Sequence, residues 1–149
     1  MIKFYRVNER YGEFSNFAPY PVKLNGKEWP TSEHYFQAQK FAGTEYEEEI
    51  RLIEFPMVAA RMGRTRSLPL REDWEQVKDD VMYEVVKAKF TQHLNLRSLL
   101  LSTDDAKLIE HTKNDNYWAD GGDGSGKNML GKILMRVREE LREEAKSDR

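Results

Sequence analysis

Alternating apolar and polar positions indicate short strands near the start of the chain. The run "IKFY" (residues 2–5) is short, apolar and followed by polar residues, which predicts a strand. In "YPVKLNGKEW" (residues 20–29), Val22 and Leu24 alternate with polar positions, and Asn25-Gly26 suits the two left-handed positions of a type I′ turn. This pattern predicts a β-hairpin, preceded by a loop at "YGEFSNFAPYP".

Further along the chain, apolar positions recur at the spacing of helices. The first predicted helix, "PTSEHYFQAQKFA" (residues 30–42), ends at Gly43. The second opens on Thr44, with Glu47 placed to complete a capping box. More helices are predicted at residues 56–63, 73–92 and 95–102 and from Asn128 onward, with a strand at 107–111. The inner face of the last helix is predicted to consist of Leu130, Ile133, Leu134, Val137 and Leu141.

This order of elements, a few strands early and many helices after them, predicts an α+β fold. We expect a single helix-rich domain over residues 1–149 with a small antiparallel sheet, because there is no repeat and no linker. Only residues 142–149, "REEAKSDR", are expected to fray.

Composition narrows the possible functions. The 149 residues carry 24 basic and 26 acidic side chains, a formal net charge of −2, which argues against a dedicated binder of duplex DNA. The chain has no cysteine, so thiolate nucleophiles and cysteine-based zinc sites are excluded. It shows no signal peptide and no segment that could span a bilayer, so we expect a cytoplasmic protein without a membrane partner. Its three histidines lack ligand spacing, so no metal and no cofactor is expected.

The segment "NDNYWADGGDGSGKNML" (residues 114–130) resembles a phosphate-binding P-loop, but only in part. Asn128 stands where Ser or Thr would hold Mg²⁺, and the preceding residues are polar rather than a buried strand. Its glycines could still let backbone N–H groups approach a ligand. A flexible surface loop is the alternative. Trp118, flanked by Asp115 and Asp120, favours a wall for a flat, polar ligand.

Two further clusters have chemical potential. On the first predicted helix, Glu33, Phe36, Gln37 and Lys40 share a face, and Glu33 lies in the first turn, where the helix dipole favours a carboxylate. This face is either a solvated surface or an acid/base and amine pair in a pocket. His34 points away and is predicted to be structural. The second cluster, "ARMGRTRS", places arginines where they could bind phosphate or cap helix carbonyls.

Taken together, "YGEFSNF", "WPTSEHYFQAQKF", "ARMGR", "VMYEVVKAKF" and "NDNYWADGGDGSGKNMLGKILM" resemble the YbiA-like N-glycosidases of the NADAR (NAD and ADP-ribose) superfamily. The resemblance runs from about Phe4 to Arg138, with the blocks in the family's order. It implies hydrolysis of the ribosyl C–N bond of early riboflavin-pathway intermediates, reactive metabolites that are harmful if they accumulate. The implied substrates are 5-amino-6-(5-phosphoribosylamino)uracil and its diaminopyrimidinone precursor, and the products are ribose 5-phosphate and the free pyrimidine.

The resemblance also implies roles for individual residues. Glu33 would be the central acid/base, Asp115 the second carboxylate, and Lys40 either a Schiff-base nucleophile or a hydrogen-bonding support. The implied substrate-binding residues are Ser15, Asn16, Phe17, Trp29, Arg61, Arg64, Trp118, Asp120, Gly121 and Gly122. Of these, the aromatic side chains would sandwich the pyrimidine, and Arg61 and Arg64 would bind the 5′-phosphate with help from the glycine-loop amides.

Two alternatives stay open. Other branches of the superfamily imply removal of ADP-ribose from guanine in nucleic acid, and a non-catalytic binder of ADP-ribose or nucleotides is the third hypothesis. The chain also departs from the family at Ala119, where glycine is usual, and alanine would be strained there if the position needs positive φ. The mechanism requires the start of the first helix and the tryptophan-bearing loop to line one cavity.

Overall fold

A computed structural model describes residues 1–147. The described chain contains helices together with short strands, which confirms the α+β fold. It divides into two compact units: Asn16–Lys89, and Met1–Ser15 together with the chain from Phe90 onward. The prediction of one domain stays a prediction. No helix among the described residues is long and apolar enough to cross a membrane.

In the Asn16–Lys89 unit, strands β2 (Val22–Leu24) and β3 (Lys27–Trp29) form the predicted antiparallel hairpin, with Val22 opposite Trp29. Asn25 and Gly26 have φ values of 56° and 75°, as the type I′ turn requires.

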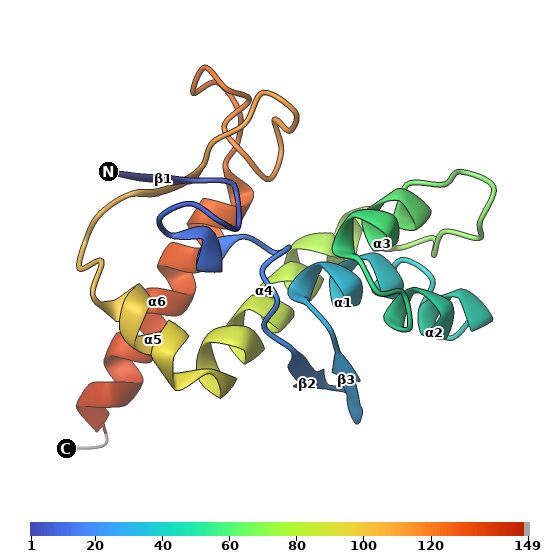
Figure 1. Cartoon of the computed structure of the whole chain (residues 1–149), viewed down its shortest axis with the longest axis horizontal. Helices are drawn as coiled ribbons and strands as arrows, with labels where there is room; N and C mark the ends of the chain where they lie inside the picture. Colours follow the sequence, from blue (N-terminus) through green and yellow to red (C-terminus); the bar gives the residue numbers. More distant parts are fainter. Residues whose placement is uncertain (148–149) are drawn as a thin grey trace. The chain divides into compact units, whose positions relative to one another are not determined.

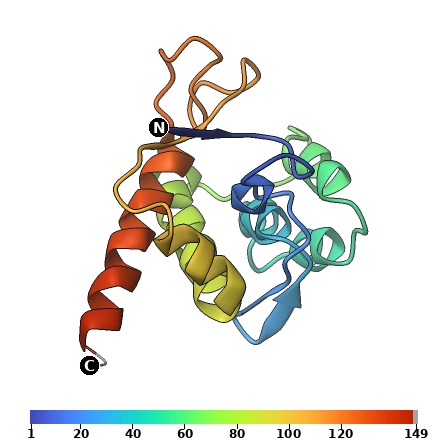
Figure 2. The ribbon, with the colours of Figure 1, turned by 60° about the vertical axis from the view of Figure 1, so that its left-hand side comes forward.

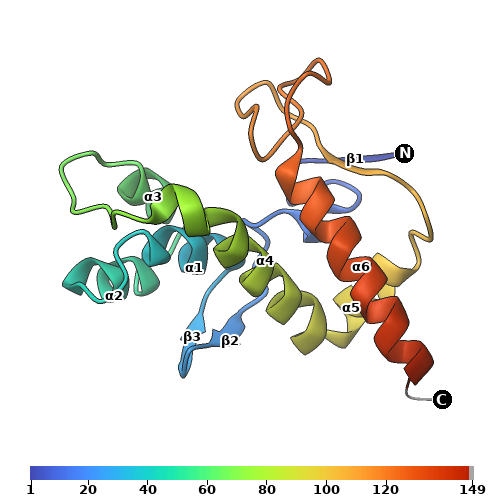
Figure 3. The same cartoon turned by 180° about the vertical axis from the view of Figure 1, so that it is seen from behind.

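Helix α1 (Ser32–Gln39) is the most enclosed element of this unit. It packs against α2 (Glu45–Arg51), α3 (Pro56–Gly63) and β3, and these elements form one group in Figures 1 and 3. Thr31 caps α1 by accepting a hydrogen bond from the His34 amide. All eight residues of α1 are buried, although most are polar. The helix is therefore an interior element whose polar side chains need partners inside the protein.

Helix α2 begins at the predicted Thr44 cap, whose Oγ1 accepts from the Tyr46 amide. Glu47 reaches back as predicted, but its Oε1 accepts from the amide of Gly43, one residue before the cap. Helix α4 (Trp74–Gln92) follows α3 after a loop and matches the predicted long helix.

The other unit contains β1 (Ile2–Phe4), the short 3₁₀ turn η1 (Gly12–Phe14), α5 (Leu94–Leu101), β4 (Leu108–Glu110) and α6 (Met129–Ser147). The predicted antiparallel sheet is the hairpin alone, because β1 pairs with β4 in parallel, with Ile2 opposite Leu108. No turn joins these two strands, so the local sequence pattern could not fix their direction.

Helix α6 packs on β4. It also lies beside α5, as Figure 2 shows. The five predicted inner residues, Leu130 to Leu141, are all buried. A Cβ added at Gly131 would lie 2.1 Å from the Leu108 carbonyl oxygen, so glycine there allows the helix to approach the strand closely. The predicted frayed end is helical as far as Ser147, and residues 148–149 lie outside the described part of the chain.

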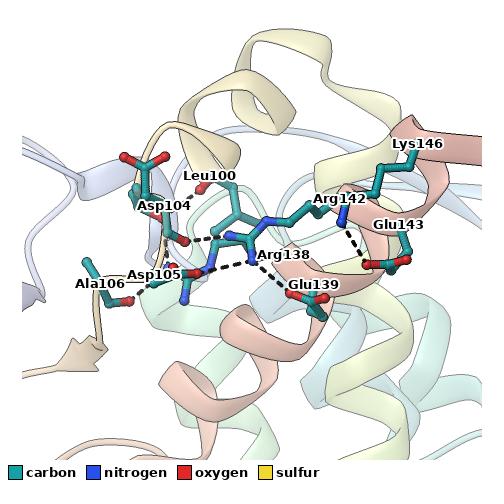
Figure 4. A network of polar contacts seen from close by, with 10 residues as sticks. Leu100, Asp104, Asp105, Ala106, Arg138, Glu139, Arg142, Glu143 and Lys146 are labelled. Atoms are coloured by element: carbon teal, nitrogen blue, oxygen red, sulfur yellow. Dashed lines mark hydrogen bonds and ion pairs between the residues drawn. The ribbon is translucent and has the colours of Figure 1, made fainter. Parts of the chain in front are cut away.

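Arginines of α6 bind the connection between α5 and β4 (Figure 4). The buried Arg138 donates from Nη1 to Thr103 Oγ1 at 2.9 Å and to the Ala106 carbonyl at 2.8 Å. One turn later, Arg142 donates to the Asp104 carbonyl at 2.6 Å. These contacts assign Arg138 a structural role within this unit.

Candidate active site

The predicted site residues fall into two local arrangements, one in each unit. The first is built on α1 and α3, and the second is the glycine-rich loop before α6, the orange segment of Figure 1.

Glu33 lies in the first turn of α1 and is only 8% exposed. Its Oε2 accepts a hydrogen bond of 2.7 Å from Gln37 Nε2, and its backbone amide donates to the Asn16 carbonyl at 3.2 Å. Ser32 Oγ donates to Asn16 Oδ1 at 2.8 Å, so both the backbone and the side chain of Asn16 are hydrogen-bonded to the start of the helix. The solvated-surface alternative for this face is therefore wrong, because Glu33 is buried and held in place.

Gln37 is a member of the site to which the sequence pattern gave no role. Its Oε1 is fully buried and has no hydrogen-bond partner among the described residues. A Cβ placed on Gly63 would stand 1.9 Å from this oxygen. Gly63 thus ends α3 and also leaves the room that Gln37 needs. The spacing of four residues between Glu33 and Gln37 was the only signal in the sequence.

Lys40 is half-buried at the C-terminal end of α1. Its Nζ donates to the Gly63 carbonyl at 3.1 Å and lies 5.9 Å from the Phe36 ring centroid and 5.8 Å from that of Trp74. Burial lowers the pKa of Lys40, Glu33 acts in the opposite direction, and Arg64 lowers it further, so that the pKa lies below its ordinary value. A lowered pKa increases the fraction of neutral amine, the form that attacks carbonyl carbon.

His34 is structural, as predicted. The ring is fully buried between Thr31 Oγ1, 2.7 Å from Nδ1, and the Ile53 carbonyl, 2.8 Å from Nε2. A carbonyl only accepts, so Nε2 carries the proton and Nδ1 accepts from the Thr31 hydroxyl. Burial lowers the pKa of His34, which favours this neutral form.

The arginines predicted to bind phosphate are available for that role. Arg61 and Arg64 are exposed at the C-terminal end of α3, and no ion pair or hydrogen bond engages either guanidinium group within residues 1–147. Arg64 also lies near enough to Lys40 to lower its pKa.

The aromatic residues predicted to stack on the substrate differ in their exposure. Phe17 is partly exposed, whereas Trp29 is fully buried, and its ring packs edge-on against Tyr35 with centroids 5.1 Å apart. The Trp29 indole N–H donates to the Leu24 carbonyl at 3.0 Å. Trp29 therefore belongs to the core of the hairpin, and its predicted stacking role is wrong. Ser15, in the other unit, is 6% exposed.

In the glycine-rich loop, Asp115 organises the backbone ahead of Trp118. Its Oδ1 accepts from the amides of Tyr117 and Trp118, both at 2.8 Å, while Oδ2 accepts no hydrogen bond from the described residues. Asp115 and Gly121 line a cavity of about 370 Å³. Trp118 is partly exposed.

Most amides of this loop are already hydrogen-bonded within it. Gly121 N–H donates to the Asp115 carbonyl, and Gly122 N–H donates to Asp120 Oδ1. At the start of α6, the amides of Met129 and Leu130 donate to the carbonyls of Tyr117 and Trp118. The predicted contribution of Gly121 and Gly122 amides to phosphate binding is therefore wrong, because those donors stabilise the loop itself.

Asp120 has the same structural function rather than the predicted ligand contact. It is 5% exposed and accepts from His111 Nδ1 at 2.7 Å, Thr112 N–H at 3.1 Å and Gly122 N–H at 2.8 Å. Burial tends to raise the pKa of Asp120, but these hydrogen bonds outweigh it and hold the pKa below its ordinary value. His111, which the sequence left without a role, is its partner.

Alanine is compatible with the loop at the position where the family usually has glycine. Ala119 is fully buried and is not among the described residues with positive φ, so its side chain causes no backbone strain. Instead, a Cβ at Gly126 would lie 2.5 Å from the Ala119 carbonyl oxygen, so the small residue is needed at Gly126. Among the residues described, no group of three or more His, Asp or Glu side chains is arranged to hold a metal ion.

Comparison with known proteins shows the family to which the chain belongs. Residues 3–142 match the NADAR domain. The chain is 62% identical over 141 residues to N-glycosidase YbiA of Escherichia coli (strain K12), covering 95% of this chain and 88% of that protein. The NMR structure of E. coli YbiA superposes with a TM-score of 0.90 at 61% identity, covering 97% of this chain and 86% of the other. A riboflavin biosynthesis protein of Vibrio vulnificus is 44% identical over 144 residues, which are 97% of this chain and 39% of that protein. The chain therefore belongs to the NADAR domain family.

Proposed function

We propose that the protein is an N-glycosidase that hydrolyses the ribosyl C–N bond of phosphorylated aminopyrimidine ribosides from riboflavin synthesis. The products would be ribose 5-phosphate and the free aminopyrimidine. The names of the relatives, an N-glycosidase and a riboflavin biosynthesis protein, support the reaction and the substrate class. The structural observation that carries the proposal is the buried Glu33–Gln37–Lys40 face of α1.

Glu33 is the proposed acid/base. Breaking an N-glycosidic bond places positive charge on the anomeric carbon and an electron pair on the departing nitrogen. A carboxyl group protonates that nitrogen, and the resulting carboxylate then removes a proton from the attacking water. Gln37 holds Oε2 of Glu33 in a fixed position, an arrangement that costs no reorganisation during the reaction.

Lys40 is the proposed nucleophile of a ring-opened route. When the ribose ring opens, the substrate becomes an imine at C1, and the neutral Lys40 amine adds to that carbon. Expulsion of the aminopyrimidine, which takes a proton from Glu33, leaves a lysine imine. Water hydrolyses this imine, which releases the aldehyde form of ribose 5-phosphate and restores the amine. The lowered pKa of Lys40 favours the first step.

Asp115 is the proposed second carboxylate. Two amides hold its Oδ1, so its orientation is fixed while Oδ2 keeps its accepting capacity. A negative oxygen in a fixed position stabilises positive charge on ribose in the transition state. Arg61 and Arg64 are the proposed 5′-phosphate ligands, because one guanidinium group can donate two parallel hydrogen bonds to phosphate oxygens.

The deciding experiment is to incubate the purified protein with the aminopyrimidine ribotide and to measure free ribose 5-phosphate. We expect release by the wild type and a loss of at least about a hundredfold in Glu33→Gln, the usual size of a general acid/base contribution. Glu49→Gln, which changes an exposed glutamate on α2, serves as the control and should match the wild type.

Parallel assays with ADP-ribosylated guanine in DNA test the rival hydrolase function. Cleavage of that substrate alone would replace the proposed one. Turnover that is equal in the wild type and in Glu33→Gln would instead reject the catalytic assignment.

A further inference from the structure

A second cavity, of about 520 Å³, adjoins the glycine-rich loop, and its lining comes entirely from the unit that contains β1, β4 and α6. Glu33, Lys40, Arg61 and Arg64 do not contribute to its walls. Its size falls within the range of small-molecule sites, roughly 300–1,000 Å³.

Four lysines surround this cavity, namely Lys3, Lys107, Lys127 and Lys132. All four are exposed, and no ion pair or hydrogen bond engages their ammonium groups within residues 1–147. Lys127 Nζ lies 5.3 Å from the centroid of the Tyr117 ring, a contact that leaves its charge uncompensated. Positive charges without a partner repel one another around this cavity, and an anion bound in the cavity would relieve that repulsion.

The two acidic residues in the lining have partners of their own. Asp120 accepts from His111 and two backbone amides, as described above. Asp123 Oδ1 accepts from the amide of Ser125 at 3.0 Å and from its hydroxyl at 2.6 Å. Among the side chains of the lining, four lysines against two carboxylates give an excess of two positive charges, in a chain whose formal net charge is −2.

The backbone positions of the lysines are fixed by the paired strands and by helix α6. Lys3 lies within β1 opposite Ile109, and Lys107 immediately precedes β4, where its carbonyl accepts from the Ile2 amide at 2.8 Å. Asn128 connects β4 to α6, because its Nδ2 donates to the Leu108 carbonyl and its Oδ1 accepts from the Glu110 amide. The elements that line the cavity are therefore held together by backbone and side-chain hydrogen bonds.

The rest of the lining limits the kind of ligand. Ile109 and Met135 add apolar surface to the lining, and Gly122, Gly124 and Gly126 of the glycine-rich loop also belong to it. We infer that this cavity binds a phosphate monoester of sugar-phosphate or nucleotide size. Its dianionic group would match the two excess positive charges, and its organic part would cover the apolar wall. The ligand is either the ribose 5-phosphate that the proposed reaction releases or a nucleotide.

Titration of the full-length protein with ribose 5-phosphate, AMP or inorganic phosphate tests this site, with binding followed by amide NMR shifts. We expect saturable shifts at Gly122, Gly124 and Ile109, weaker binding at high salt, and tighter binding of the esters than of inorganic phosphate. The preferred ester identifies the source of the ligand.

Single variants then establish whether the lysines are responsible. Lys107→Gln and Lys132→Gln should each weaken ester binding by about fivefold, the upper end of the contribution of one exposed charge. The control is Lys146→Gln, which removes the same charge from α6 at a residue outside the cavity lining and should bind like the wild type. Shifts that never saturate, or equal weakening in Lys146→Gln, would overturn the proposal. Glu33→Gln should retain this binding while losing turnover, so failure of the cavity and failure of the proposed reaction give different results.

Discussion

Gln37 donates a 2.7 Å hydrogen bond to Glu33 one turn earlier on α1, and both side chains are buried. A buried carboxyl group needs such a partner to stay in one position. The pair connects the interior packing of α1 to the proposed chemistry, since Gln37 also contacts Gly63, whose carbonyl accepts from Lys40.

Replacing Gln37 should therefore impair catalysis more than folding. In Gln37→Leu, Oε2 of Glu33 loses the hydrogen bond from Gln37, and we expect kcat to fall by about tenfold, because a hydrogen bond to a charged group contributes about 1.5–3 kcal/mol. The control is Gln39→Leu on the same helix, since Gln39 is equally buried but donates to Glu47. Steady-state kinetics and thermal unfolding of both variants check this. A kcat in Gln37→Leu that equals the value in Gln39→Leu would remove the positioning role.

A methyl group at Gly63 should displace Gln37. The added Cβ would meet Gln37 Oε1 at 1.9 Å and Cδ at 2.6 Å, so we expect Gly63→Ala to lose about 1–3 kcal/mol of unfolding free energy together with activity. Gln37→Ala removes both atoms. The double variant Gly63→Ala/Gln37→Ala should therefore be less destabilised than the sum of the single variants, as denaturant titration would measure. Additive losses would show that the clash lies elsewhere.

Local signals in the sequence predicted much of this architecture. Asn25-Gly26 fixed the hairpin, Thr44 began α2, and the apolar spacing from Leu130 to Leu141 gave the buried face of α6. Each of these features depends on residues close together in the chain, which is why pattern reasoning succeeds there.

The errors and omissions concern hydrogen-bond partners and burial, which the pattern of apolar and polar positions does not identify even when the partner lies only a few residues away. Trp29 was predicted to stack on the substrate, but its ring is buried and its indole N–H donates to the Leu24 carbonyl. Asp120 resembled a ligand contact, but His111 and the loop amides occupy its oxygens. A polar face such as that of α1 looks the same in sequence whether water or protein covers it. The expectation that Glu33 and Trp118 line one cavity stays a prediction.

Lys40 should form a covalent adduct that can be trapped. Borohydride reduces an imine to a stable amine, so we expect mass spectrometry to find a pentose phosphate attached at Lys40 after reduction during turnover. Because the pKa of Lys40 is lowered, the yield should rise with pH earlier than for an ordinary lysine and then level off. Lys40→Met should give no adduct. A fully active Lys40→Met protein without any trapped species would leave Lys40 only a supporting role.

Asp120 should make stability depend on pH in the acid range. Its pKa in the folded protein lies below the ordinary value, so the folded state binds its proton more weakly than the unfolded state. The resulting stabilisation is complete above the unfolded pKa, near 3.8, and is lost as pH falls through the lower folded pKa. We expect Asp120→Asn to be less stable than the wild type at neutral pH by about 3 kcal/mol, because its hydrogen bonds are charge-assisted.

The comparison for Asp120 is Asp123→Asn, an exposed aspartate of the same loop. Hydrogen bonds from Ser125 lower the pKa of Asp123 too, but an exposed carboxylate contributes less to stability than a buried one. Asp123→Asn should change stability much less than Asp120→Asn. Urea unfolding of the three proteins across the acid range measures both effects. Parallel stability curves for the wild type and Asp120→Asn would contradict the assignment.

Arg61 and Arg64 should discriminate phosphorylated from dephosphorylated substrate. Both guanidinium groups are exposed and have no partner within the described chain, so their removal should not disturb the fold. In Arg61→Ala or Arg64→Ala we expect kcat/KM for the ribotide to fall by about tenfold or more, since a hydrogen bond to a charged group contributes about 1.5–3 kcal/mol. The value for the dephosphorylated riboside should change little, except that loss of Arg64 raises the pKa of Lys40 slightly. Arg66→Ala, an exposed arginine of the same segment, is the control. If both substrates lose equally in Arg61→Ala, this arginine has a structural role and the phosphate is bound by other residues.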